Sequence, residues 1–192
     1  MNEPPDRAEQ VIHVQWTGPF TFADALTFTD RRTDYGVYQV CGLHPAYGQR
    51  TLLYLGRAQQ QTFGKRLSQE GWERWQVTNG NVVVYLGRLA GAVTPPDADW
   101  DEQIALTERL LIVAYRPAHN ASGLYRNDDP AFKHLHVLNW SDRGYLSPEV
   151  SGARWATRFS VIENYAIYGG HPTDTPRAES PDAAGDEPGP II

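Results

Sequence analysis

Five side chains in this sequence have the types needed to break a phosphodiester bond: two tyrosines, two arginines and one glutamate. Tyr38 and Tyr54 lie in two runs of β-branched and aromatic residues, Arg57 and Arg66 follow the second run, and Glu108 comes later. Such a reaction needs a nucleophilic water, a base, positive charge opposite the developing phosphate charge, and help for the leaving oxygen. These five side chains can together supply each of those needs.

A tyrosine serves as the base only where a nearby cation favours its phenolate, because its unperturbed pKa is about 10. Arg57 and Arg66 are the candidates for that cation and for holding the scissile phosphate. Glu108 alone is an incomplete cage for a metal ion. A single carboxylate suits Mg²⁺, which keeps several waters and takes phosphate oxygens of the substrate as further ligands.

The two tyrosines are expected on neighbouring strands of a β-hairpin. Two apolar runs flank a loop that carries His44-Pro45-Ala46-Tyr47-Gly48, a sequence typical of a turn. If Tyr38 pairs with Tyr54, the turn is centred on Ala46, and the two Cβ atoms lie roughly 5 Å apart on one face of the sheet. Arg57 would then follow the end of the second strand.

Glu108 lies on the clearest predicted helix, which extends over 99–115. It falls in an apolar sector of the helical wheel, between Ile104, Leu111 and Ile112. A buried carboxylate needs a cation, a proton or a position at the rim. The pattern therefore leaves two alternatives open, a salt bridge to an arginine and a metal ion.

The rest of the chain contains further helix and strand patterns. Asp99 can cap the long helix, with Glu102 as its capping-box partner. The near-continuous apolar run over 82–86 indicates a strand buried on both faces. The remaining predictions are a strand over 11–16 ended by Gly18-Pro19, a short helix within 20–28, a helix over 58–70, and strands over 135–140 and 155–162.

Two short motifs in the hairpin resemble the signatures of the GIY-YIG nuclease family. Gly36-Val37-Tyr38 matches the first signature and Tyr54-Leu55-Gly56 matches the second. The similarity extends over Tyr35 to Asn120, and each short signature is weak by itself. The six matches in the family's order are the two signatures together with Arg57, Arg66, Glu108 and Asn120.

This resemblance implies a fold and a set of roles. The implied fold is α/β (α+β), with a small, mainly antiparallel central sheet of three core strands flanked by helices, to which both extensions add strands. In the family one tyrosine activates water, the other orients it, arginine stabilises the phosphate, and glutamate holds one divalent ion, Mg²⁺ or Mn²⁺. The resemblance thus implies catalytic roles for Tyr38, Tyr54, Arg57, Arg66 and Asn120, metal binding by Glu108, and substrate binding by Arg57, Arg66 and Lys65. Without it, ordinary packing accounts for each of these residues.

Glu70 is the main departure from the family pattern. Four residues after the helix arginine the family commonly has His or Tyr, and this chain has glutamate. His119, next to Asn120, is an alternative carrier for the proton. The departure keeps two other functions open beside a DNA endonuclease: a nucleic-acid-binding module without turnover, and a protein-interaction domain that engages a partner through an acidic tail.

Domain organisation follows from composition and from the extent of the resemblance. The tail contains no aromatic residue and many Pro, Asp, Glu and Ala residues, which is typical of disorder. The predicted parts are a disordered N-terminus (1–10), a packed extension (11–34), the nuclease-like core (35–120), a C-terminal extension of the same domain (121–171) and a disordered acidic tail (172–192).

Net charge and composition limit which classes of binding partner are expected. The net charge is −6, but residues 1–10 contribute −2 and residues 173–192 contribute −4, so 11–172 is neutral. A neutral domain can bind DNA through a local basic face, although long-range attraction is modest. A single cysteine, Cys41, and the absence of an apolar run near 20 residues favour a cytoplasmic protein without a membrane span. We expect DNA as the partner, with RNA as an open alternative and a homodimer as a means of cutting both strands.

Overall fold

The protein has an α+β fold, described here from a computed structural model. Residues 9–71, 82–91, 96–125 and 129–155 are described, and they all lie within the compact unit 1–161. The predictions for residues 1–8, for 156–162 and for the tail lie outside these ranges. The strands are β1 (Gln10–Thr21), β2 (Gly36–His44), β3 (Gly48–Ala58), β4 (Val83–Ala90), β5 (Leu135–Ser141) and β6 (Glu149–Ser151). The helices are α1 (Phe22–Ala25), α2 (Phe63–Gln69), α4 (Asp97–Tyr115), the 3₁₀ turn η1 (Pro130–Phe132) and α5 (Gly152–Trp155).

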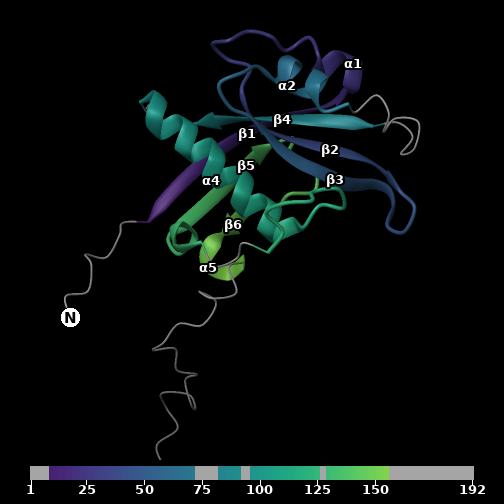
Figure 1. Cartoon of the computed structure of the whole chain (residues 1–192). Helices are drawn as coiled ribbons and strands as arrows, with labels where there is room; N and C mark the ends of the chain where they lie inside the picture. The colour runs from purple at the N-terminus through teal and green to yellow at the C-terminus, as the bar shows by residue number, and fades with distance from the viewer. Residues whose placement is uncertain (1–8, 72–81, 92–95, 126–128, 156–192) are drawn as a thin grey trace, which may run out of the picture. The chain divides into compact units, whose positions relative to one another are not determined.

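The six strands form one mixed, mostly antiparallel sheet that curls into a half-barrel (Figure 1). Its order is β3-β2-β4-β1-β5-β6. All neighbouring pairs are antiparallel except β1 and β5, which run parallel. The expected mainly antiparallel sheet is therefore confirmed, and strands β1, β5 and β6 add to the three strands β3, β2 and β4.

The hairpin of β2 and β3 forms as predicted, but its register differs. His44 pairs with Gly48, so the turn is centred on Ala46. Two irregularities then shift the pairing along the hairpin, so that Tyr38 lies opposite Gly56 and Tyr54 lies opposite Val40. The predicted direct Tyr38–Tyr54 pair is therefore wrong, because bulges add residues to β3 that a strict alternation does not include.

The two faces of the sheet pack against different helices (Figure 1). On one face, Val37 and Leu55 pack with the apolar side of α4 in the larger core cluster. On the other face, Tyr38 packs with Phe63 and Leu67 of α2 and with α1. Since side chains alternate along a strand, consecutive residues of β2 face different helices.

Several predicted boundaries are corrected by the structure. β1 continues past Gly18-Pro19 to Thr21, with an irregularity in its pairing with β4 between Thr17 and Phe20. Residue 58 ends β3, and α2 begins only at Phe63, where the Thr62 side chain caps it. β4 is not buried on both faces, because buried and half-buried residues alternate along it.

The long helix begins two residues earlier than predicted. Pro96 occupies the N-cap position of α4 without a side-chain hydrogen bond, so the proposed Asp99 cap is wrong. The helix ends where Arg116 adopts a left-handed backbone conformation just before Pro117. Within the described ranges, no helix combines the length and apolar character required to cross a bilayer.

Candidate functional site

Tyr38 and Tyr54 lie on the same face of the hairpin, on the side of α2. Their ring centroids are 6.1 Å apart and the rings are inclined by 32°. Gly56, opposite Tyr38, makes this arrangement possible, because a Cβ at that position would lie 2.6 Å from the Tyr38 hydroxyl oxygen and 2.6 Å from Tyr54 Cε1. The glycine of the second signature therefore provides the space in which the two phenols approach each other.

Arg66 brings a positive charge to both phenols. Burial raises the pKa of Tyr38 well above its ordinary value, and the charge of Arg66 lowers it only in part. The pKa of Tyr54 is also raised, first by burial and then by the carboxylates of Glu70 and Glu108. Both side chains are consequently neutral phenols at pH 7, and Tyr38 is fully buried.

Glu70 pairs with Arg66 one turn earlier in the chain. Its carboxylate also raises the pKa values of Tyr38 and Tyr54. The residue that departs from the family pattern thus belongs to the same group of charges as the tyrosines. The signal for this contact in the sequence is the spacing of Glu70 from Arg66, the i, i+4 spacing of neighbours on a helix face.

Glu108 reaches the site from the other face of the sheet. Arg57 lies opposite Val37 in the α4-facing layer, and its Nη1 is 3.3 Å from Glu108 Oε2. The salt bridge that the sequence left open as an alternative is therefore present. The Glu108 side chain is 17 % exposed, so it lies near the rim and is not sealed in the core. Arg57 lies within β3, one residue before its end, and not beyond it.

The residues on the α2 side of the sheet and those on the α4 side meet around β3, the end strand of the sheet. Burial raises the pKa of Glu108, whereas Arg57, Arg66 and Arg109 lower it and Glu70 raises it further. Glu108 also influences Tyr54 from the opposite layer. The tyrosines, the two arginines and the two glutamates therefore form one electrostatic cluster, although they come from both faces of the sheet.

Asn120 does not join this cluster through its side chain. Its Oδ1 accepts a hydrogen bond from Leu55 N at 3.0 Å, and its Nδ2 donates to Leu55 O at 2.9 Å. The preceding residue, His119, donates its backbone N–H to Leu53 O at 2.8 Å. Asn120 is 7 % exposed, so its position indicates that it supports β3 between the two signature residues Tyr54 and Gly56.

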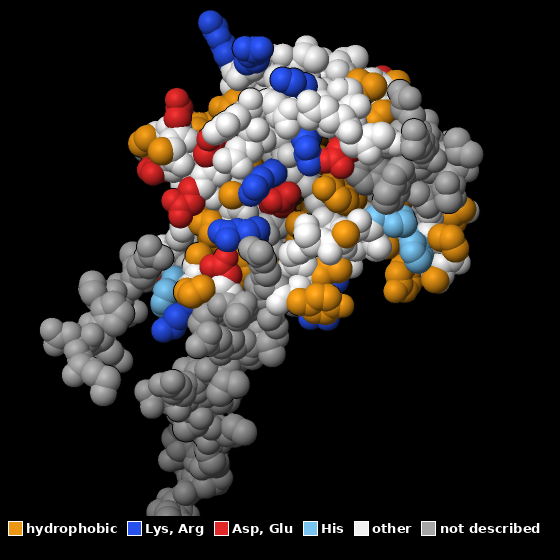
Figure 2. All heavy atoms as spheres, viewed as in Figure 1, with side chains coloured by type: hydrophobic (Ala, Val, Ile, Leu, Met, Phe, Trp, Pro, Cys, Tyr) orange, Lys and Arg blue, Asp and Glu red, His pale blue; other side chains and the backbone are white. Residues whose placement is uncertain are grey.

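Positive charge is distributed unevenly around the cluster. Arg57 and Arg66 are each paired with a glutamate, whereas Lys65 faces solvent beside Arg66. In the centre of the face in Figure 2, blue side chains lie against red ones. At the top of the same view, near α1 and α2 in Figure 1, blue side chains gather without red neighbours. A local basic area of this kind is the feature that a neutral domain needs to bind a polyanion.

Glu108 is the carboxylate of this cluster that could bind a divalent cation. Among residues 9–71, 82–91, 96–125 and 129–155, no group of three or more His, Cys, Asp or Glu side chains is arranged to hold a metal. A complete protein cage is therefore missing in the described ranges. Glu108 offers carboxylate oxygens near the rim, and burial disfavours its charge, so a cation beside it would be stabilising. Mg²⁺ is commonly bound in this way, through one or two carboxylates plus water and substrate phosphate.

Comparison with known proteins gives no family assignment. No family model, curated protein or solved structure matches this chain. The resemblance to the GIY-YIG family therefore depends on the six matches in the sequence alone.

Proposed function

We propose that this protein is a metal-dependent endonuclease that hydrolyses phosphodiester bonds in DNA. The observation that supports the proposal is the convergence of Tyr38, Tyr54, Arg66 and Glu108 around one strand. These residues come from β2, β3, α2 and α4, which are distant in the chain, and each type has a use in phosphoryl transfer. Packing alone does not require a tyrosine pair, an arginine and a rim glutamate to share one location.

In this proposal the arginines bind the scissile phosphate and balance the charge that develops on it. Arg guanidinium groups present planar forks that match phosphate oxygens. Binding would draw Arg57 away from Glu108, which would leave that carboxylate to hold one Mg²⁺ or Mn²⁺. The ion, when bound, would supply Lewis-acid stabilisation of the phosphate oxygens.

The phenols orient the attacking water. Since burial keeps Tyr38 protonated at neutral pH, its hydroxyl donates or accepts a hydrogen bond and does not act as a phenolate. Tyr54 is less buried and lies nearer the charges of Glu70 and Glu108. In this proposal the proton released by the water passes to the Glu70 carboxylate, while the bond between phosphorus and the leaving oxygen breaks and that oxygen takes a proton from solvent water.

A plasmid-cleavage assay with a titration of Mg²⁺ and Mn²⁺ tests this proposal. Glu108→Ala and Tyr38→Phe are expected to lower the cleavage rate by about 100-fold or more, the effect of losing a group that acts in the transition state. Matched controls are Glu102→Ala on the exposed side of α4 and Tyr47→Phe at the hairpin tip, where the side chain is 73 % exposed. Cleavage that needs no metal, or that survives both site substitutions, would refute the assignment.

A nucleic-acid-binding module without turnover is the second candidate. The pairing of Arg66 with Glu70 supports it, because a paired arginine has less charge available for a phosphate. In that case DNA binds in a salt-dependent way and remains intact with or without metal. Glu70→His separates the two candidates: a gain of cleavage would show that the site lacks one residue, and parallel assays on RNA would identify the preferred polymer.

A further inference from the structure

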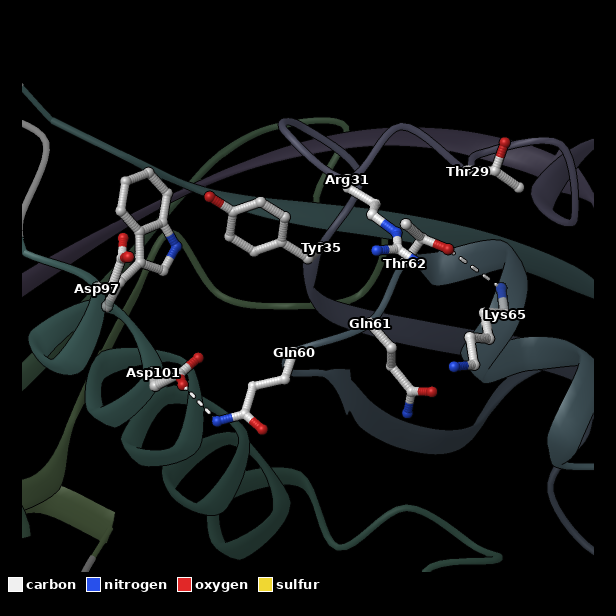
Figure 3. Close-up of a pocket in the computed structure, with 10 residues that line it drawn as sticks. Thr29, Arg31, Tyr35, Gln60, Gln61, Thr62, Lys65, Asp97 and Asp101 are labelled. Carbon is white, nitrogen blue, oxygen red and sulfur yellow. Dashed lines mark hydrogen bonds between the residues drawn. The ribbon is translucent and has the colours of Figure 1, made fainter.

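A cleft lies near the candidate active site, and Lys65 of its lining is next to Arg66 on α2. The cleft has a volume of about 650 Å³, which is typical of small-ligand sites. Its walls come from the segment before β2, the loop between β3 and α2, the start of α2 and the first turns of α4. Figure 3 shows its labelled side chains converging from these elements.

The cleft has one cationic end. Arg31 and Lys65 lie toward α2 in Figure 3, and the Thr62 hydroxyl lies near them. Within the part of the chain that the structure describes, neither Arg31 nor Lys65 forms a salt bridge, in contrast to Arg57 and Arg66. Unpaired Arg and Lys side chains at the mouth of a cleft suit a phosphate group.

The other end is aromatic and acidic. Tyr35 and Trp100 form a corner with ring centroids 5.6 Å apart and an angle of 53° between the rings. Asp97 and Asp101 lie beside Tyr35 in Figure 3. The buried indole Nε1 of Trp100 has no hydrogen-bond acceptor among the described residues. A nucleobase can stack on these aromatic rings. The neighbouring carboxylates can accept hydrogen bonds from its exocyclic amino group.

One acidic side chain is already held in position. Gln60 Nε2 donates to Asp101 Oδ2 at 2.9 Å, and Gln60 itself has a backbone φ of +58°. A non-glycine residue in this conformation is uncommon and often marks a functional segment. The second oxygen of Asp101 retains free acceptor capacity.

Two helices connect the lining of the cleft with residues of the candidate active site. Lys65 is adjacent to Arg66 on α2, and Asp101 precedes Glu108 by seven residues, or two turns, on one face of α4. Two turns of a helix correspond to roughly 10 Å. A ligand that occupies the cleft would therefore be close to a phosphate held by the cluster around β3.

We propose that the cleft binds one unstacked nucleotide of a DNA strand, next to the scissile phosphate. The base stacks against Tyr35 and Trp100, its amino group faces Asp97 or Asp101, and the adjoining phosphate contacts Arg31 and Lys65. This assignment rests on the proposed nuclease function, and it specifies an unpaired or flipped nucleotide as the element that the protein recognises.

Binding of a labelled single-stranded dC 12-mer, followed by fluorescence anisotropy in EDTA, tests the cleft without cleavage. The double substitution Arg31→Ser with Lys65→Ser is expected to weaken binding about tenfold, and Tyr35→Ser by a similar factor through lost stacking. The matched control is Arg32→Ser with Lys133→Ser, which removes one arginine and one lysine from exposed positions outside the cleft. Asp97→Asn is expected to reduce the preference for the dC 12-mer over a dT 12-mer.

The possible outcomes separate this inference from the nuclease proposal. Cleavage that depends on Glu108, combined with equal oligonucleotide affinities for the cleft and control variants, would overturn the inference and leave the nuclease standing. Binding that depends on the cleft, without any cleavage, would support the nucleotide-binding role of the cleft and refute the nuclease. The inference also fails if the wild-type protein binds no oligonucleotide, or if a basic peptide occupies the cleft in its place.

Discussion

At the scale of single residues, the space left by Gly56 shapes the candidate site. The two phenols are diagonal neighbours across the hairpin, and a side chain at position 56 would occupy the gap between them. The arrangement also explains why the second signature ends in glycine in this chain. The tyrosine pair therefore requires a residue without a side chain at position 56.

Gly56→Ala is therefore expected to destabilise the protein by about 1–3 kcal/mol, the usual cost of forcing an extra methyl group into a packed location. It should also lower DNA cleavage, because Tyr38 and Tyr54 must move apart. Urea unfolding measures the first effect and the plasmid assay the second. Gln49→Ala, at an exposed position of the same strand, is the control. An unchanged free energy of unfolding would mean that the two phenols can move apart without destabilising the fold.

Because its pKa is raised, the ionised Glu108 carboxylate should lower the stability of the fold while it supports cleavage. A carboxyl whose folded pKa exceeds its unfolded value of 4.5 contributes stability below pH 4.5, and this contribution is lost as the pH rises through the folded pKa. At pH 7 the ionised carboxylate is thus a net cost to folding. Glu108→Gln is expected to raise the urea midpoint at pH 7 while it abolishes cleavage.

The stability difference between Glu108→Gln and the wild type should shrink when the unfolding is repeated below pH 4.5. Glu102→Gln, exposed on the same helix, should show neither effect. A lower midpoint for Glu108→Gln at pH 7 would instead show that the ion pair with Arg57 outweighs the cost of burial. That result would favour a structural role for Glu108.

At the scale of elements, the segment after α4 supports the end strand of the sheet. Backbone bonds from residues 118 and 119 reach Leu52 O and Leu53 O, and the Asn120 side chain bonds both the N–H and the C=O of Leu55. An end strand otherwise presents unpaired backbone groups. The helix that carries Glu108 is therefore tied directly to the strand that carries Tyr54 and Arg57.

Asn120→Ala is expected to reduce stability by about 1–3 kcal/mol, because it leaves buried backbone groups of β3 unsatisfied. Cleavage should fall in proportion to the loss of folded or ordered protein. Ser122→Ala, exposed two residues later, is the control. Tyr38→Phe provides the contrast, since it should remove activity with little change in stability. Full stability of Asn120→Ala combined with lost cleavage would make Asn120 a direct participant in the reaction.

At the scale of the whole molecule, charge is separated along the chain. Residues 173–192 carry a net −4 of the total −6. The cations near the cleft therefore act within a chain whose overall charge opposes the approach of DNA. Such a distribution weakens long-range attraction and makes binding depend on local contacts.

Deletion of residues 173–192 is expected to tighten DNA binding by about twofold to tenfold at low salt. The gain should be largest near 0.01 M salt, where the screening length is about 30 Å, and smaller at 0.15 M, where it is about 8 Å. Fluorescence anisotropy of a labelled oligonucleotide at both salt concentrations measures this gain in affinity. A variant whose acidic residues in 173–192 are replaced by their amides separates charge from chain length. Unchanged DNA affinity, with loss of binding to another protein, would favour the protein-interaction function.

Local patterns in the sequence determined much of the architecture. The apolar runs predicted β2, β3 and β5, the wheel of apolar residues predicted α4, and the Pro- and Gly-containing loop predicted a turn centred on Ala46. These features depend on neighbouring residues and on the periods of helix and strand, so they can be predicted without tertiary contacts. The same periodicity placed Glu108 at the border of an apolar helix face.

Only the tertiary structure decided how the candidate site is put together. The bulges of β3 set the diagonal arrangement of the phenols, Arg57 pairs with Glu108 on one face while Arg66 lies with the phenols on the other, and Asn120 bonds the backbone of Leu55. The cleft between Tyr35 and Asp101 likewise brings together segments about sixty residues apart. Such contacts depend on packing between distant segments, for which the local sequence carries no signal.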